Sequence, residues 1–216
     1  FVVDPGTKAV CFDIDGTLTP GDQEIIKQLA LDTVNFSYNP VIRPAAVSMV
    51  RWWYSHGYLL VYLSGRQGSA YNLTREWLIK QGFPPGLIGH TQTHVPTMPI
   101  YKLGSESGGL GVGTFKLNFM QSLLDQGISF EALYGNTMTD IHAYEKMPVS
   151  KERTFIAGPF GGREGTVDVV CCICAWLILQ GREFCGAPEG IGRHQNRTSI
   201  LHASTRLVVF VEHLGA

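Results

Sequence analysis

The sequence predicts an α/β protein in three layers, an α/β/α arrangement in which helices cover both faces of a mostly parallel β-sheet. Two observations carry this prediction. Short apolar runs alternate with helix-compatible segments along the chain, and several of these runs stop at a turn that carries polar side chains. With 216 residues, of which 44% are hydrophobic and 16% are charged, the chain can form one domain with a sizeable core.

The expected core strands are continuous apolar runs, which are typical of strands buried on both faces of a parallel sheet. They comprise residues 8–12, 58–63, 130–134 and 153–157. The segment 83–113 is rich in Gly, Pro, Ser and Thr. There we expect a short strand at 87–89 and a surface loop or hairpin with a second β-prone piece at 100–103.

Helices are expected between the strands. They comprise residues 22–33, 45–56, 69–80 and 114–126, and a last helix that has Asp140 in its first turns and reaches Lys146. Asp22 can cap the first helix, and Gly57 and Gly82 end the second and third. The apolar stripe of the first helix predicts packing against the core, and a mobile flap over the site is the alternative.

The alternation of strands and helices stops at residue 165. We therefore predict one domain over residues 1–165, with a minimal cap or none, and a C-terminal extension of unclear structure over residues 166–216. Because residue 1 is Phe rather than Met, the sequence is compatible with a piece of a longer, multidomain chain.

The charge and the cysteines limit the partners and the compartment. A formal net charge of −1 gives no support to a nucleic-acid partner or to a polybasic membrane anchor. The five cysteines do not resemble a disulfide framework, which favours a reducing, cytoplasmic setting. Zinc is an alternative for the residues Cys171, Cys172, Cys174, Cys185 and His194. Their spacing matches no familiar zinc finger, so buried or incidental thiols are favoured.

Two carboxylates follow the first predicted strand. Asp13 and Asp15 lie two residues apart, directly before Gly16. Because side chains alternate along a strand, both carboxylates start on the same side, at the end of the sheet where open α/β proteins bind ligands. Two neighbouring anions repel each other, and a divalent cation is the usual remedy. An ordinary Asp-rich turn is the alternative for this stretch taken alone.

Other polar residues come at or after the remaining strand ends, and the carboxyl ends of parallel strands meet at one edge of a sheet. These residues are Ser64, Gly65, Lys116, Asn136 and Asp140. The combined set is typical of phosphoryl transfer. A carboxylate can form an aspartyl-phosphate, and a second carboxylate two residues on can protonate the leaving oxygen and later deprotonate water. Asp140 completes an oxygen-rich Mg²⁺ site.

The phosphate itself needs donors. The hydroxyl of Ser64, the N–H of Gly65 and the ammonium of Lys116 can hold phosphoryl oxygens. Each has a simpler alternative, since Ser64 can cap a helix, Lys116 can be a solvated helix residue, and Asn136 can favour a left-handed turn. For Arg66 we leave two interpretations open, a surface residue or a contact to phosphate.

The ordered set Asp-x-Asp-Gly-Thr, Ser-Gly-Arg, Lys and Gly-Asn-x-x-x-Asp resembles the haloacid-dehalogenase (HAD) superfamily of phosphatases. More narrowly, it is similar to the LNS2 domain shared by lipins and the Nir/RdgB phosphatidylinositol-transfer proteins. Lipin-like features are residues 13–19, 115–116 and 135–144, and Nir-like features are residues 43–44, 57–62, 65–66 and 82–88. The resemblance covers residues 8–162, and it implies a Rossmann-like HAD sheet.

The resemblance also implies roles for individual residues. Asp13 would be the nucleophile and a Mg²⁺ ligand, and Asp140 would be the other metal carboxylate. Asp15 would be the general acid and base and would bind Mg²⁺ through its backbone carbonyl. The phosphate-binding and supporting residues that it implies are Thr17, Ser64, Gly65, Lys116 and Asn136.

Lipin-type enzymes are Mg²⁺-dependent phosphatidate phosphatases that make diacylglycerol, whereas Nir-type copies lack the first aspartate and serve as phosphatidate-binding modules that target membranes. Because this chain keeps Asp13 and Asp15, we predict hydrolysis of a phosphomonoester, with phosphatidate as substrate, by a cytoplasmic protein at a peripheral membrane surface. The alternative is a phosphatidate-binding module without turnover, in a lipid-transfer protein. A third option, a phosphatase for soluble sugar or nucleotide phosphates, would need a larger insertion to cover its substrate.

Overall fold

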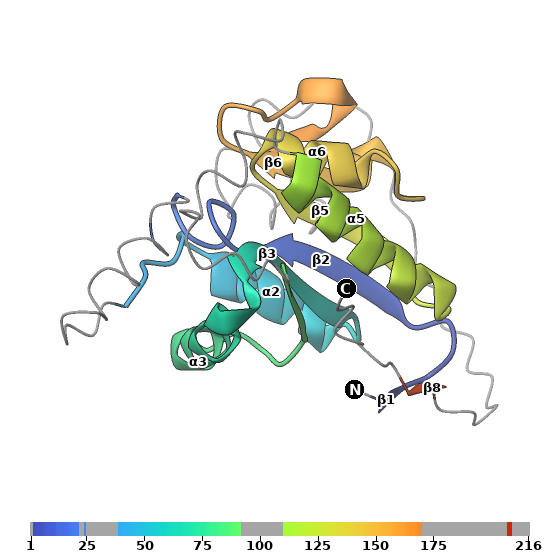
Figure 1. Cartoon of the computed structure of the whole chain (residues 1–216), viewed down its shortest axis with the longest axis horizontal. Coiled ribbons are helices and arrows are strands. Elements are labelled where there is room, and N and C mark those ends of the chain that lie inside the picture. The colour runs from blue at the N-terminus through green and yellow to red at the C-terminus, as the bar shows by residue number, and fades with distance from the viewer. Residues whose placement is uncertain (1, 22–23, 25–38, 92–109, 170–206, 209–216) are drawn as a thin grey trace.

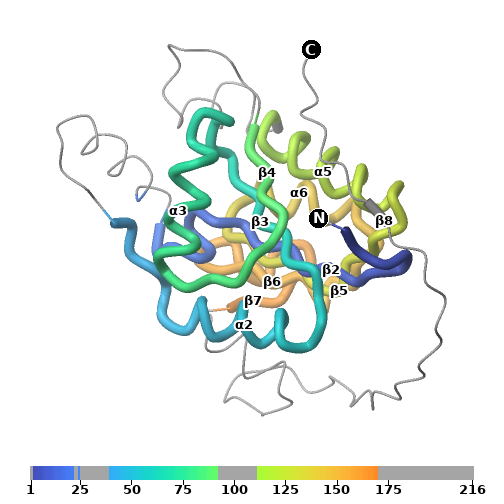
Figure 2. The backbone as a smooth tube through the Cα atoms, turned by 90° about the horizontal axis from the view of Figure 1, so that it is seen from below, coloured from blue at the N-terminus to red at the C-terminus, as the bar shows by residue number. Residues whose placement is uncertain are grey.

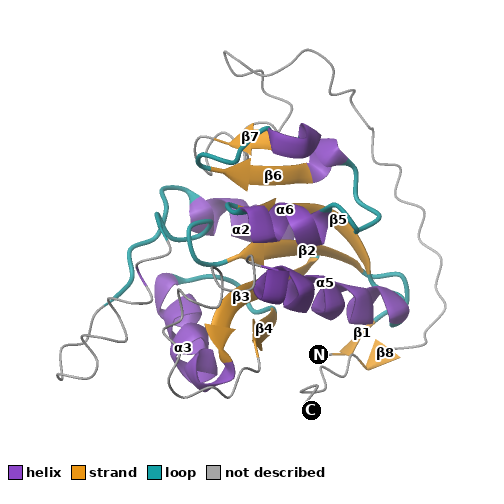
Figure 3. Ribbon diagram, turned by 45° about the horizontal axis from the view of Figure 1, so that its top comes forward, coloured by secondary structure: helices purple, strands orange, loops and turns teal. Residues whose placement is uncertain are grey.

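The computed structural model of the chain describes residues 2–21, 24, 39–91, 110–169 and 207–208 (Figure 1). Its centre is a six-stranded sheet with the order β4-β3-β2-β5-β6-β7, in which every neighbouring pair is parallel. The strands are β2 (Lys8–Asp13), β3 (Leu59–Gln67), β4 (Leu87–Thr91), β5 (Ser129–Gly135), β6 (Thr154–Ala157) and β7 (Val167–Val169). Figure 3 shows them side by side from β7 at one edge to β4 at the other. This arrangement confirms the predicted fold class.

Helices cover both faces of the sheet, as predicted for three layers (Figure 2). One face packs against α2 (Ala46–Ser55) and α3 (Tyr71–Gln81), and the other against α5 (Leu110–Asp125) and α6 (Met138–Tyr144). The short 3₁₀ helices are η1 (Gly68–Ala70), η2 (Lys151–Arg153) and η3 (Arg163–Gly165), and a small antiparallel pair joins β1 (Val2–Val3) to β8 (Leu207–Val208). Within the described ranges, every helix is too short or too polar to span a bilayer.

Aromatic side chains from four neighbouring strands form a row under α2 and α3. The ring of Phe12 lies 4.8 Å from that of Tyr134, and Tyr134 lies 4.8 Å from Phe155, with nearly parallel planes. Tyr62 extends the row to β3, at 6.3 Å from Phe12. From the helix layer, the indole Nε1 of Trp53 donates to the Tyr134 hydroxyl at 3.1 Å. This packing fixes the carboxyl ends of β2, β3 and β5 against one another.

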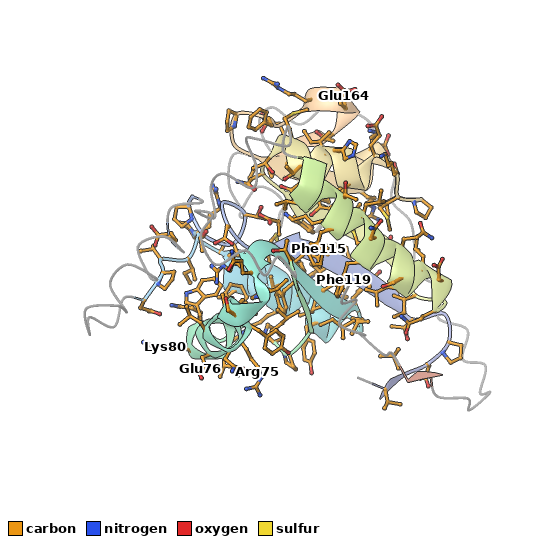
Figure 4. All side chains as sticks on the ribbon, in the orientation of Figure 1. Arg75, Glu76, Lys80, Phe115, Phe119 and Glu164 are labelled. Atoms are coloured by element: carbon orange, nitrogen blue, oxygen red, sulfur yellow. The ribbon has the colours of Figure 1, made fainter. Side chains whose placement is uncertain are left out.

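The helices carry charged side chains on their outer sides and apolar side chains toward the sheet (Figure 4). Arg75, Glu76 and Lys80 are exposed on the outer side of α3. On α5, by contrast, Phe119 is buried against β4, where a side chain at Gly89 would overlap its ring. The glycine therefore allows α5 to lie close to the sheet.

Two element boundaries differ by four residues from the sequence prediction. Helix α5 begins at Leu110 rather than at residue 114, because glycines that suggested a loop permit close packing on α6: a Cβ at Gly113 would lie 3.0 Å from the carbonyl oxygen of Thr139. Strand β3 runs to Gln67 rather than to residue 63, because its polar end pairs with Thr91 of β4.

The sheet also continues beyond residue 165, the predicted end of the domain. Strand β7 pairs in parallel with β6, through Phe155 and Val167 among others. The predicted helix at 22–33, apart from helical Glu24, and the β-prone piece at 100–103 lie outside the described residues. So does most of the predicted C-terminal extension.

Candidate active site

Two of the predicted carboxylates meet on one buried lysine. The Lys116 Nζ donates to Asp13 Oδ1 at 2.5 Å and to Asp140 Oδ1 at 2.5 Å. All three side chains are at most 4% exposed. Residues that are 24 to 127 positions apart in the chain thus form a single charged cluster at the carboxyl edge of the sheet.

Each member of this cluster is placed by a different element. Asp13 is the last residue of β2, and Lys116 projects from the second turn of α5. Asp140 lies in the first turn of α6 and forms a capping box with Thr137. Its Oδ2 accepts from the backbone N–H and hydroxyl of Thr137, both at 2.9 Å, and from the N–H of Asn136 at 3.0 Å. The start of the helix therefore orients this carboxylate.

Burial and the shared charges set the protonation of the cluster. Burial raises the pKa of Asp13 well above its usual range; Lys116 opposes this effect, and the negative charge of Asp140 adds to it. Burial alone would raise the pKa of Asp140 too, but Lys116 and the N–H donors at the start of α6 lower it below its usual value. The two carboxylates raise the pKa of Lys116 against the effect of burial, so the lysine stays charged.

Asp15 points to a different set of partners. Its Oδ1 accepts from Nη2 of Arg66 at 2.8 Å, and its Oδ2 accepts from Nε of Arg66 and from the hydroxyl of Ser64, both at 2.9 Å. The Arg66 side chain is 1% exposed. The interpretation of Arg66 as a surface residue is therefore wrong, because the side chain is buried and its guanidinium binds the carboxylate of Asp15.

The turn after β2 is held by Arg43. Its Nη2 donates to the carbonyl of Gly16 at 2.6 Å, and its Nε donates to the carbonyl of Thr17 at 3.2 Å. Gly16 has a positive φ of 85°, which favours glycine at this position. Thr17 in turn donates to Asp13 Oδ2 at 2.9 Å, so the turn orients the second oxygen of that carboxylate.

The structure thus brings most of the predicted site residues together. Thr17 and Lys116 bind Asp13, and Lys116 also binds Asp140. Thr17 lies 3.5 Å from the Asn136 side-chain oxygen. Their contacts to phosphate stay predictions, as do those of Ser64 and Gly65. Sequence reasoning missed the ion pair of Arg66 with Asp15 and the bonds of Arg43 to the turn after β2. The first had a usable signal, because Ser64 and Arg66 lie two residues apart on an extended strand and so share a face.

The residues present fit a divalent cation. Asp13 and Asp140 already reach one cationic group, Lys116, and their donors are the hard oxygens that Mg²⁺ prefers. In the described part of the chain, no three side chains among His, Cys, Asp and Glu are grouped to hold a metal. Since the Asp15 carboxylate lies on Arg66, Asp15 would contribute through its backbone carbonyl, and Mg²⁺ often takes only one or two protein carboxylates.

A substitution at Gly135 would test how tightly Asp140 is packed in the cluster. A Cβ at this position would lie 2.5 Å from the Cβ of Asp140 and 2.7 Å from its Cγ. We expect Gly135→Ala to displace Asp140 and to lower the free energy of unfolding by about 1–3 kcal/mol, measured by urea denaturation. Gly21→Ala is the matched control, because a Cβ there meets nothing within 4 Å. Equal stability of the two variants would contradict the expectation.

His90 lies next to Ser64 in the register of β3 and β4. Its Nδ1 lies 3.2 Å from the carbonyl of Gln67, and its Nε2 is buried without a partner among the described residues. Burial, helped by the positive charge of Arg66, lowers the pKa of His90 to about 4. The unfolded chain, with a histidine pKa of about 6.5, therefore takes up this proton first when the pH falls.

The native chain is accordingly expected to lose stability as the pH falls from about 6.5 to about 4, by up to about 3 kcal/mol more than a His90→Gln variant. Urea denaturation of both proteins at several pH values measures the difference. His56→Gln, at an exposed position, is the control and should follow the native chain. A His90→Gln variant with the native pH dependence would contradict the assignment.

Comparison with known proteins agrees with this fold. The family model of the PITM 1-3 LNS2 domain matches residues 10–158. Protein retinal degeneration B of Drosophila melanogaster is 31% identical over 160 residues, which are 74% of this chain and 11% of that protein. Human membrane-associated phosphatidylinositol transfer protein 1 is 30% identical, over 73% of this chain and 11% of that protein. The chain spans about a tenth of the length of these relatives.

Solved structures show the same fold at low identity. A D,D-heptose 1.7-bisphosphate phosphatase from B. bronchiseptica, complexed with magnesium and phosphate, superposes with a TM-score of 0.55 at 10% identity, over 81% of this chain and 98% of that one. A phosphoserine phosphatase in apo form gives a TM-score of 0.51 at 12% identity, over 82% of this chain and 100% of that one. The chain belongs to the family of LNS2 domains of PITM 1-3 and Nir/RdgB proteins, with a HAD-like fold.

Proposed function

We propose that this chain is a Mg²⁺-dependent phosphatase that hydrolyses a phosphomonoester through an aspartyl-phosphate, with phosphatidate as the substrate and diacylglycerol as the product. One observation supports this proposal most directly. The carboxylate of Asp13 is buried at the carboxyl edge of the sheet and is oriented on both oxygens, by Lys116 and by Thr17. A nucleophile held in one orientation beside a fixed positive charge suits attack on an anionic substrate.

The reaction would proceed in two displacements. An oxygen of Asp13 attacks phosphorus, the bond between phosphorus and the ester oxygen breaks, and the leaving oxygen takes a proton from Asp15. A water molecule then attacks the same phosphorus and gives a proton to Asp15. The bond between phosphorus and Asp13 breaks, which releases inorganic phosphate and restores the carboxylate.

Charge in the site would be balanced by Lys116 and by the metal. Because the pKa of Lys116 is raised, its ammonium stays positive beside the nucleophile. Mg²⁺, held by Asp13, Asp140 and the backbone carbonyl of Asp15, would supply further positive charge against the phosphate anion. Gly65 and Ser64 are the proposed donors to the phosphoryl oxygens at the end of β3. Because a hydroxyl has one hydrogen, Ser64 would give up its bond to Asp15 Oδ2 when it donates to phosphate.

A phosphatidate-binding module without turnover is the second candidate. It is favoured by the relatives, which are named as membrane-associated phosphatidylinositol transfer proteins and in which the matching region is about a tenth of the chain. In that case the domain would recognise the lipid phosphate at a peripheral membrane surface in a cytoplasmic, multidomain protein. The two candidates share the ligand and differ in whether the P–O bond is cleaved.

The test is the release of inorganic phosphate from phosphatidate in mixed micelles, with Mg²⁺ and with a chelator. The proposal expects Mg²⁺-dependent release, with a higher kcat/KM for phosphatidate than for glycerol 3-phosphate, the same headgroup without acyl chains. Faster turnover of the soluble ester would exclude the lipid assignment. Binding to phosphatidate vesicles without any release would favour the module.

A further inference from the structure

Asp15 is held more firmly than an ordinary carboxylate at a turn. Nη2 of Arg66 donates to Oδ1 at 2.8 Å, and Nε donates to Oδ2 at 2.9 Å, so the guanidinium grips both oxygens. The hydroxyl of Ser64 adds a second bond to Oδ2 at 2.9 Å. Such a two-point contact fixes the plane of the carboxylate as well as its position.

Arg66 is itself fixed by contacts on its other side. Its Nη1 donates to the hydroxyl of Thr74 in α3 at 2.9 Å, and its guanidinium carbon lies 6.0 Å from the centre of the Trp77 ring. Its backbone N–H donates to the hydroxyl oxygen of Ser64 at 3.1 Å. The residue is 1% exposed, so the guanidinium cannot move away without breaking these contacts. Helix α3 and strand β3 therefore hold Asp15 through Arg66.

The pattern of bonds leaves one oxygen of Asp15 with an open acceptor position. Among the described residues, Oδ2 accepts two hydrogen bonds and Oδ1 accepts one. A carboxylate offers about two acceptor positions on each oxygen, so an open position remains on Oδ1. The Asp15 side chain is 15% exposed, so an incoming ester can approach Asp15.

We propose that Arg66 is a positioning residue that aims Oδ1 of Asp15 at the leaving oxygen in the first displacement and at the attacking water in the second. This inference rests on the proposed phosphatase function. Arg66 touches neither phosphate nor metal in this role. It acts through Asp15, and through its bond to Thr74 it links the position of that carboxylate to helix α3.

The experiment measures kcat and kcat/KM of the native chain, Arg66→Gln, Asp15→Asn and the double variant. The substrates are phosphatidate, which has a poor alkoxide leaving group, and p-nitrophenyl phosphate, whose leaving group needs little protonation. We expect Arg66→Gln to lower kcat/KM for phosphatidate about 100-fold and for the aryl ester by less than about tenfold. In the Asp15→Asn background, the same change should lower the rate by no more than about twofold, because the group on which Arg66 acts is gone.

Two further variants separate positioning from a purely structural role. Arg51→Gln is the matched control, because Arg51 donates from Nε to the Gly82 carbonyl on the same layer and is exposed. It should leave both rates unchanged. Thr74→Val removes only the bond to Nη1 and should give a smaller loss that is again greater for phosphatidate. This variant decides the question if Arg66→Gln fails to fold.

The possible results are distinct. An Arg66→Gln variant with equal losses on both esters, with a native or faster rate, or with a full additional loss in the Asp15→Asn background would overturn the positioning role while the phosphatase function stood. Equal losses for Thr74→Val on the two esters would do the same. If the native chain released phosphate from neither ester, the proposed function itself would fail, and the role of Arg66 would fail with it.

Discussion

Phosphate release by an Asp13→Asn variant is expected to fall at least about a thousandfold below that of the native chain, because an amide cannot form the aspartyl-phosphate. The measurement is the rate of phosphate release from phosphatidate at saturating Mg²⁺. Asn is nearly isosteric with Asp, and its side-chain oxygen can still accept from Lys116 or Thr17. The loss should therefore appear in kcat without a comparable loss of folded protein.

The fold of this variant is checked by its thermal midpoint. Lys116 keeps Asp140 as a counter-ion when Asp13 is neutral, so we expect the midpoint to stay within a few degrees of the native value. Asp4→Asn, at an exposed aspartate in the turn before β2, is the matched control and should keep the native rate. An Asp13→Asn variant that released phosphate at the native rate would show that Asp13 is not the nucleophile.

Removal of the lysine is expected to have the largest effect on stability. Lys116→Met leaves Asp13 and Asp140 buried near each other without a positive partner, and an uncompensated buried charge typically costs about 3–5 kcal/mol. We expect the free energy of unfolding in metal-free buffer to fall by an amount in this range, as measured by urea denaturation. Activity should be lost as well, because the nucleophile would no longer be oriented.

Lys8→Met provides the control for this experiment. Lys8 also forms an ion pair, with Glu131 at 2.9 Å, but its side chain is 60% exposed, and such surface pairs contribute less than about 1 kcal/mol. A second substitution gives an internal check, since Asp13→Asn added to Lys116→Met removes one of the two stranded anions and should recover part of the stability. If Lys116→Met and Lys8→Met had equal effects, the buried cluster would not be the source of the stability.

Much of the fold follows from local sequence signals. Strands such as β2 are continuous apolar runs because they are buried on both faces, and glycines such as Gly82 end helices through a positive φ. The start of α5 could not be predicted in the same way. Gly113 reads locally as a loop residue, but the decisive factor is its contact with α6, which depends on the tertiary structure. A propensity rule cannot include a contact between two residues that are 26 positions apart in the chain.

The candidate site shows the same division. The sequence alone predicts the proximity of Asp13, Lys116 and Asp140, because the carboxyl ends of parallel strands meet at one edge of a sheet. This prediction does not depend on how the helices pack. For Arg66 the strand period gives the face that it shares with Ser64, but its partner was decided by how far β3 continues past its apolar part and by Thr74 of α3. The ion pair with Asp15 therefore depends on a strand end and a helix that sequence patterns place only within a few residues.

The two carboxylates of the charged cluster differ in their hydrogen-bond partners, so their substitution would affect the domain differently. Asp140 binds the backbone at the start of α6, so a chain that lost it would lose the local order of that helix together with any chemistry. The described partners of Asp13 are side chains only, Thr17 and Lys116. A substitution at Asp13 would therefore remove the proposed turnover and leave these backbone bonds of α6 intact, so a ligand-binding domain without turnover would be one substitution away.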